Sequence, residues 1–158
     1  MSLKFLLPTV FFCAVATGSL AGNLQPREGW VVLETTKTYS QLIDDVKTAS
    51  KSNSMGIVTQ AGPTKAAANR GITIPGNRVI GIFNNDFAVR VLATSTAAMI
   101  EAPIRLYVTE ETDGHATLSY KVPSHVFSPY FSEGGIELVT LASELDQKFS
   151  TIAQQSVE

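Results

Sequence analysis

Residues 103–110 read PIRLYVTE and residues 115–122 read HATLSYKV, and Asp113-Gly114 lies in the short link between them. Both runs alternate between apolar and polar residues and are rich in β-branched and aromatic side chains, which is typical of strands. Asp-Gly between two such runs is a strong signal for a β-hairpin. We therefore expect two antiparallel strands here, with Pro123 ending the second run.

Alternation also assigns the two faces of this hairpin, because successive side chains of a strand point to opposite faces of its sheet. One set is apolar and is expected to face the helices: Ile104, Leu106, Val108, Ala116, Leu118 and Tyr120. The other set is expected on the opposite, outer face: Arg105, Tyr107, Thr109, His115, Thr117, Ser119 and Lys121. The outer face is polar without being strongly charged, so it is predicted to be either open to solvent or covered by a partner.

The segments around the hairpin alternate between strand and helix patterns. β-Branched runs predict strands at residues 30–36, 55–60 and 78–83. Apolar residues at helical spacing predict amphipathic helices at 38–52 and 136–154, with a short Ala-rich helix at 64–70. Thr38 and Gln41 have the spacing of a capping box at the start of the first helix. The pattern over 84–100 is weaker, and 123–135 is interpreted as a loop with one helical turn.

This order of elements predicts an α+β fold. We expect a mainly antiparallel sheet with two principal helices packed on one face, in the order strand, helix, several strands, helix. A chain of 158 residues is enough for one domain, which we place at residues 29–155.

The first 21 residues have the pattern of a secretory signal peptide. Lys4 precedes an apolar run at residues 5–16, and small residues follow, with Ser19 and Ala21 at the −3 and −1 positions. The apolar run is too short to span a membrane. We therefore expect cleavage after Ala21 and a secreted or periplasmic product. Residues 22–28 are expected to form a short exposed lead-in, and residues 156–158 a flexible tail.

Removal of this segment leaves 137 residues with a net charge of −3 and no cysteine, because Cys13 is the single cysteine of the chain. A thiol enzyme, a disulfide scaffold and a multi-cysteine metal site are therefore excluded for the mature chain. The slightly acidic balance also argues against nucleic-acid binding through phosphate contacts. No second apolar stretch reaches membrane-spanning length, and the sequence contains no Gly-x-Ser-x-Gly motif of a serine hydrolase. We assign neither catalytic residues nor a cofactor.

The candidate ligand-binding residues are polar and aromatic: Asn84, Asn85, Arg90, Arg105, Tyr107 and Tyr120. Alternation places Arg105 and Tyr107 together on the outer face of the hairpin, although it places Tyr120 on the core side. An arginine with nearby amides can hold a carboxylate or another small anion, which would place a small-molecule ligand in a cleft beside Asn84 and Arg105. For Arg105 and Tyr107 we favour the other interpretation, in which they line a homodimer interface, where both residue types are common.

His115 and His125 are the only histidines of the chain. As metal or haem ligands they would indicate a metal- or haem-handling protein or a weakly signalled enzyme. No His-x-x-x-His spacing links them, so we assign no metal site. Two classes of function stay open at this point. We favour a non-enzymatic, exported binding or interaction module over an enzyme or a metal-handling protein.

The order of several short motifs resembles the domain of unknown function 302 family of small bacterial proteins. The motifs are Met55-Gly56-Ile57-Val58, the small-residue helix ending at Gly71, residues 78–84 (RVIGIFN), Ala102-Pro103-Ile104-Arg105, Asp113-Gly114, and Ser119-Tyr120 followed by Pro123. The chain departs from the family's usual Phe-Gly-Asn-Pro at Phe83-Asn84-Asn85-Asp86, and it has Ala102 where the family usually has Leu. The resemblance implies a fold similar to that of the TATA-box-binding protein, often as a homodimer. It implies no reaction.

Overall fold

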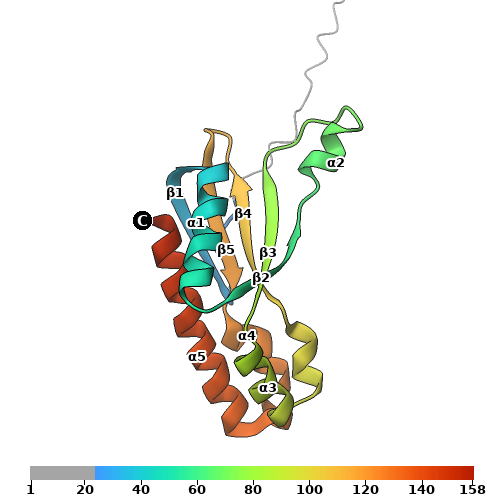
Figure 1. Cartoon of the computed structure of the whole chain (residues 1–158), viewed down its shortest axis with the longest axis vertical. Coiled ribbons are helices and arrows are strands. Elements are labelled where there is room, and N and C mark those ends of the chain that lie inside the picture. Colours follow the sequence, from blue (N-terminus) through green and yellow to red (C-terminus); the bar gives the residue numbers. More distant parts are fainter. Residues whose placement is uncertain (1–23) are drawn as a thin grey trace, which may run out of the picture.

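The structure, a computed structural model, describes residues 24–158 and contains one five-stranded antiparallel sheet. The strand order across the sheet is β1-β5-β4-β3-β2. The strands are β1 (Trp30–Thr38), β2 (Gly56–Ala61), β3 (Asn77–Phe83), β4 (Ile104–Glu110) and β5 (His115–Lys121). The predicted α+β class is confirmed: the sheet is antiparallel throughout, and its helices cover one face (Figure 1).

The predicted hairpin is confirmed as β4 and β5, in which Leu106 lies opposite Tyr120 and Val108 opposite Leu118. Its turn is closed by local hydrogen bonds, because the amide of His115 donates to the Asp113 carboxylate at 3.0 Å. Gly114 has a φ of 84°, a left-handed conformation that glycine adopts without steric cost. The Asp-Gly signal therefore predicted this turn for the correct physical reason.

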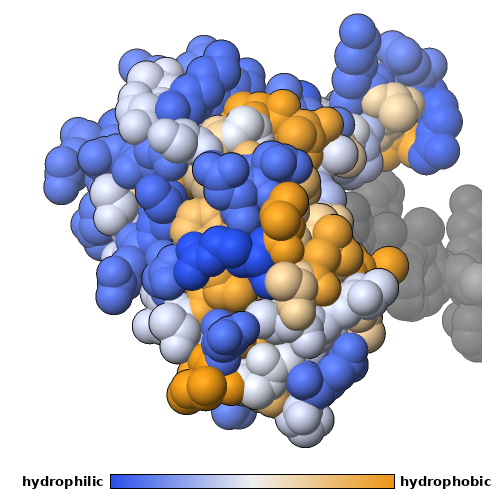
Figure 2. All heavy atoms as spheres, turned by 60° about the horizontal axis from the view of Figure 1, so that its bottom comes forward, coloured by the Kyte–Doolittle hydropathy of each residue, from blue (hydrophilic) through white to orange (hydrophobic). Residues whose placement is uncertain are grey.

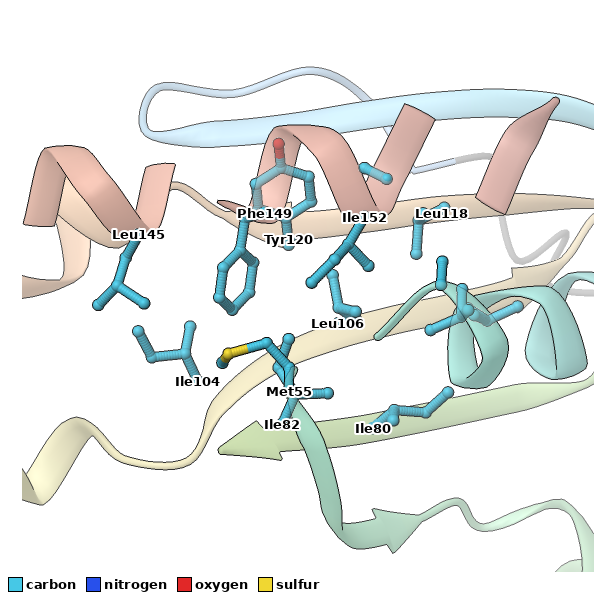
Figure 3. Close-up of a cluster of buried hydrophobic side chains, with 14 of the residues drawn as sticks. Met55, Ile80, Ile82, Ile104, Leu106, Leu118, Tyr120, Leu145, Phe149 and Ile152 are labelled. Carbon is cyan, nitrogen blue, oxygen red and sulfur yellow. The ribbon is translucent and has the colours of Figure 1, made fainter. Parts of the chain in front are cut away.

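Two helices pack on the inner face of the sheet: α1 (Tyr39–Ser52) and α5 (Phe131–Val157). The capping box predicted at the start of α1 is present, with Thr38 and Gln41 bonded to one another's backbone amides. The core between the layers is apolar, and Leu106, Leu118 and Phe149 are fully buried in it. Figure 3 shows Phe149 and Ile152 of α5 pointing toward the strands, with Met55 entering from the start of β2. All six residues predicted to face the helices are buried.

Helices also close the lower end of the sheet in Figure 1, where the sequence pattern was weak. They are α3 (Asn85–Thr94), the 3₁₀ helix η1 (Ala97–Glu101), α4 (Pro123–Phe127) and the 3₁₀ helix η2 (Ser128–Tyr130). Residues 123–135 were predicted to form a loop with one helical turn; the helical turn is present as α4, but the loop was wrong, since most of the segment is helical. Pro123 and Pro129 stand in first turns, where a proline costs no intrahelical hydrogen bond. Gly135, with a φ of 62°, kinks α5 near its start.

A short arm carries the remaining helix, α2 (Thr64–Ala68), between β2 and β3. It projects from the upper end of the sheet in Figure 1. The signal peptide and cleavage site predicted for residues 1–21 lie outside the described residues. Within residues 24–158, no helix is both long enough and apolar enough to cross a membrane.

Candidate functional site

The outer face of the sheet is arranged in rows of facing side chains that follow from the register. One row contains Trp30, Lys121, Arg105 and Gly81, from β1, β5, β4 and β3 in turn. The next row contains Val32, Ser119, Tyr107 and Val79. Members of both rows line a hollow of about 440 Å³, whose lining includes Trp30, Val79, Glu101, Arg105, Tyr107 and Lys121. Its volume falls in the usual range for small-molecule sites.

Cations gather at this hollow although the chain as a whole carries a net charge of −2. The Arg27 guanidinium lies 5.2 Å from the centre of the Trp30 ring, and the Lys121 ammonium lies 5.7 Å from it. Both distances suit a cation–π interaction. Within residues 24–158, neither Arg105 nor Lys121 forms an ion pair. The hollow therefore holds two cations whose charge no carboxylate of the described chain offsets by direct contact.

Glu101 places a carboxylate in the lining of the hollow, and this carboxylate already accepts a hydrogen bond from Tyr130. Tyr130 Oη donates a hydrogen bond to Glu101 Oε1 at 2.8 Å. This hydrogen bond, more than burial, raises the pKa of Tyr130 above its ordinary value. On the opposite side, Asn77 Nδ2 donates to Tyr107 Oη and holds that ring in place.

Two hydroxyl groups on the outer face are buried without a hydrogen-bond partner. Thr117 and Ser119 were predicted on this face, and their exposed fractions are 1% and 0%. Neither Thr117 Oγ1 nor Ser119 Oγ finds an acceptor or donor in the described part of the chain. Burying an unpartnered hydroxyl costs free energy, so this face contains polar groups that the fold itself does not satisfy.

The lead-in before β1 follows the outer face. Leu24 lines a neighbouring hollow together with Tyr107 and Thr109, while residues 25–28 are exposed. At its end, Gly29 has a φ of 71°, and a Cβ there would lie 2.3 Å from the His125 ring. Gly29 also accepts a hydrogen bond from the amide of Val122 at 2.9 Å. The lead-in is therefore attached at the same end of the sheet as Trp30 and Lys121.

Three of the six predicted ligand-binding residues line the hollow: Arg105, Tyr107 and Tyr120. Tyr120 belongs mainly to the core, as alternation predicted, since its ring centre lies 5.6 Å from that of Phe149. Burial, followed by the charge of Asp146, raises the pKa of its phenol. Arg105 and Tyr107 are thus the two predicted residues whose side chains belong to the outer face.

The other three predicted residues do not line this hollow, so the prediction of a cleft shared by Asn84 and Arg105 was wrong. Asn84 caps α3: its Oδ1 accepts from the amides of Asp86 and Phe87, and its Nδ2 donates to the Ser54 carbonyl at 2.8 Å. These bonds use the groups that a ligand would need. Asn85 begins α3 as an exposed residue and does not line the hollow.

Arg90 lies in a second hollow, a groove of about 410 Å³ between α3 and α5. Its guanidinium binds both carboxylate oxygens of Glu144, at 2.7 and 2.8 Å. The hydrogen bonds and charge of Glu144 raise the pKa of Arg90, and those of Arg90 lower the pKa of Glu144. The outer-face hollow and this groove have similar volumes. In the groove, however, Glu144 already neutralises the charge of the arginine.

Apolar side chains are exposed around this groove and on the end of the molecule that Figure 2 brings forward. The most exposed are Ile100 at 78% and Ile136 at 76%, followed by Val89 and Leu92 of α3. They share this end with Arg90 and its groove.

The two histidines do not form a pair. His115 begins β5 and bonds to Asp113 in the hairpin turn at 3.1 Å, whereas His125 lies in α4 beyond the other end of the strand. The length of β5, roughly 20 Å, separates them. Among residues 24–158, no group of three or more His, Cys, Asp or Glu side chains could hold a metal ion.

Comparison with known proteins places this arrangement in a family. The family model of the domain of unknown function DUF302 matches residues 31–156. The chain belongs to the DUF302 family. A crystal structure of an uncharacterized conserved DUF302 protein from Bacillus stearothermophilus superposes with a TM-score of 0.72 at 14% sequence identity, covering 82% of this chain and 99% of that one. A search of curated proteins found no match.

Trp30, Lys121 and Val79 of this DUF302 chain also belong to the hollow, although they were not among the predicted ligand-binding residues. Alternation had placed Lys121 on the outer face, but it could not show that β1 pairs with β5 and so brings Trp30 beside it. The order of strands in the sheet was the missing information. A lone tryptophan at the start of a strand was the one signal that could have indicated this position.

Proposed function

We propose that the protein is an exported, non-enzymatic binding module whose outer-face hollow holds a small organic molecule. One observation carries the proposal: the aromatic ring of Trp30 and two cations that form no ion pair within residues 24–158, Arg105 and Lys121, line one hollow of about 440 Å³. Ligand sites commonly combine an apolar surface with a few converging polar groups. Export rests on the signal peptide predicted for residues 1–21.

The groove between α3 and α5 is the natural comparison for this proposal. It is about as large, but the chain's own Glu144 already fills the binding positions of Arg90. A ligand there must compete with an intramolecular carboxylate. In the outer-face hollow, a ligand meets Arg105 and Lys121, which form no ion pair within residues 24–158, and this difference supports the outer face as the binding site.

Pairing of two copies through the outer face is a second candidate. Arg105 and Tyr107 favour it, because both residue types are common at protein interfaces. The lead-in limits such pairing, since Leu24 lies beside Tyr107 and Thr109 on part of that face. Light scattering separates the two candidates. A mass of two chains that falls to one in Tyr107→Ala supports the homodimer, and a monomer with bound ligand supports the binding module.

The direct test is to identify what the protein carries. The mature chain is purified without denaturation, extracted with organic solvent and analysed by mass spectrometry. Val79→Phe places a larger side chain in the outer-face hollow, whereas Ala93→Phe places the same side chain in the α3–α5 groove as a matched control. We expect a near-stoichiometric small molecule with the wild-type chain and with Ala93→Phe, and its loss with Val79→Phe.

A negative extraction is followed by a fragment screen, so that the proposal stays testable. Aromatic and aliphatic acids, amides and amines are added to the ligand-free protein and observed by NMR. An empty extract together with no binding fragment would overturn the proposed function. Urea unfolding of both phenylalanine variants checks that each one is folded.

A further inference from the structure

We infer that the ligand of the outer-face hollow is a small organic monoanion, a carboxylate on a flat apolar body. The inference rests on the proposed function, because it names the chemical class that the same hollow selects. Its basis is the row Trp30, Lys121, Arg105 and Gly81, which crosses four strands of the sheet.

Arg105 and Lys121 occupy facing positions on neighbouring strands. They adjoin Leu106 and Tyr120, which are opposite in the register of β4 and β5, so the two cations point to the same face. Like charges directly opposite one another destabilise a sheet. Neither cation has an ion-pair partner within residues 24–158. An anion bound between them relieves this repulsion and gains two charge-assisted hydrogen-bonding partners.

No carboxylate can reach Arg105 from its other neighbouring strand. The facing residue on β3 is Gly81, and a Cβ there would lie 2.1 Å from Thr59 Oγ1 and 2.9 Å from Pro103. The threonine and the proline therefore fill the space beside Gly81 with uncharged groups. Arg105 is left facing Lys121 and the hollow.

Glu101 restricts the charge of the ligand. It lines the same hollow, and its carboxylate stays fixed by the hydrogen bond from Tyr130. A second negative charge on the ligand would face repulsion from this fixed carboxylate. Among the residues that line the hollow, the cations Arg105 and Lys121 together with this one anion give a net charge of +1, which matches a monoanion. Arg27 lies over the Trp30 ring and is not part of the lining.

Trp30 determines the shape of the ligand body. Its ring already attracts the Arg27 and Lys121 cations, at 5.2 and 5.7 Å. The ring thus keeps the Lys121 ammonium close to an aromatic surface. A ligand whose carboxylate meets Lys121 and Arg105 brings its own body against Trp30, and flat apolar groups pack best against an indole ring.

The test uses matched probes and a single reporter signal. Because the chain contains one tryptophan, its ¹H–¹⁵N NMR spectrum has one indole cross-peak, and this peak reports on the hollow alone. The mature protein is titrated with naphthalene-2-carboxylate, with the neutral naphthalene-2-carboxamide and with the cationic naphthalen-2-ylmethylammonium. We expect the carboxylate to shift the indole peak and to bind at least about tenfold more tightly than the amide. Of the three probes, only the carboxylate should bind more weakly when salt is added.

Two charge-matched variants complete the test. Arg105→Gln should weaken carboxylate binding about tenfold or more and leave amide binding unchanged, whereas Arg90→Gln should change neither. Equal binding of carboxylate and amide, or preference for the ammonium, overturns the anion inference while the binding module stands. If none of the probes shifts the peak, an identified co-purified compound decides: a carboxylate or other monoanion supports the inference, and a neutral or cationic compound overturns it. An empty extract and no binding by any probe overturn the proposed function as well.

Discussion

The two faces of the sheet are built from the same strands but have different physical characters. On the inner face, Leu106 and Leu118 are fully buried beneath α1 and α5 with other apolar side chains. On the outer face, Arg105 and Lys121 line an open hollow without ion-pair partners in the described chain, and two hydroxyls are buried there without hydrogen bonds. The comparison separates two roles: substitutions on the inner face should change stability, and substitutions on the outer face should change binding.

The largest expected effect is on the inner face. Phe149→Ala removes a fully buried ring that packs against Tyr120 and should lower the free energy of unfolding by about 3–5 kcal/mol. Lys121→Ala, on the outer face, should change it by no more than about 0.5 kcal/mol. Urea unfolding followed by circular dichroism measures both values. A similar loss for the two variants would contradict the division of roles between the faces.

A smaller change in the free energy of unfolding is expected for buried hydroxyl groups, of which one on each side of the sheet can be compared. Ser95, on the helical side, donates to Glu133 at 2.8 Å and accepts from the amide of Ala98 at 3.0 Å. Ser95→Ala should therefore cost about 1–3 kcal/mol of unfolding free energy. Thr117→Val replaces an unpartnered hydroxyl on the outer face with a methyl group of similar shape, so stability should be unchanged or increase by up to about 1 kcal/mol. A clear loss in Thr117→Val would mean that its hydroxyl has a partner in solution.

The smallest effect concerns the exposed ion pair of the α3–α5 groove. Arg90 lowers the pKa of Glu144 below the ordinary carboxylate value of 4.5. A depressed carboxylate pKa adds stability above the unfolded-state value, and that stability is lost as the pH falls through the folded-state pKa. Glu144→Gln should therefore be slightly less stable than the wild-type chain at pH 7, and the difference should shrink as the pH falls below about 5. Urea unfolding over a pH series measures it, and a difference that is constant with pH would exclude the ion pair as its cause.

Local sequence patterns predicted the fold well wherever one or two residues determine the backbone conformation. Asp113-Gly114 and the alternation on either side predicted the hairpin and both of its faces, and Thr38 predicted the start of α1. The helical segment at 123–135 was missed because its prolines suggested a loop. A proline in a first turn is compatible with a helix, and α4 packs on the later turns of α5, where the amide of Ser124 donates a hydrogen bond to Asp146.

The candidate site could be predicted only in part, because long-range partners decide which polar residues are free. Arg90 and Arg105 are equivalent as sequence features, but Glu144, 54 residues away, neutralises Arg90. Asn84 was predicted to bind a ligand, but its side chain caps the N-terminus of α3. Arg105 and Tyr107 were predicted correctly as a pair on the outer face, since alternation alone determines that placement.

The most direct test of the account is to map where an organic anion binds. Naphthalene-2-carboxylate is added to the ¹⁵N-labelled mature protein, and the shifted backbone amides are located on the structure. The account predicts shifts on the row of Trp30, Arg105 and Lys121, with the α3–α5 groove around Arg90 unaffected. Shifts concentrated at that groove, or spread evenly over the surface, would contradict the claim that the outer face of the sheet is the binding site.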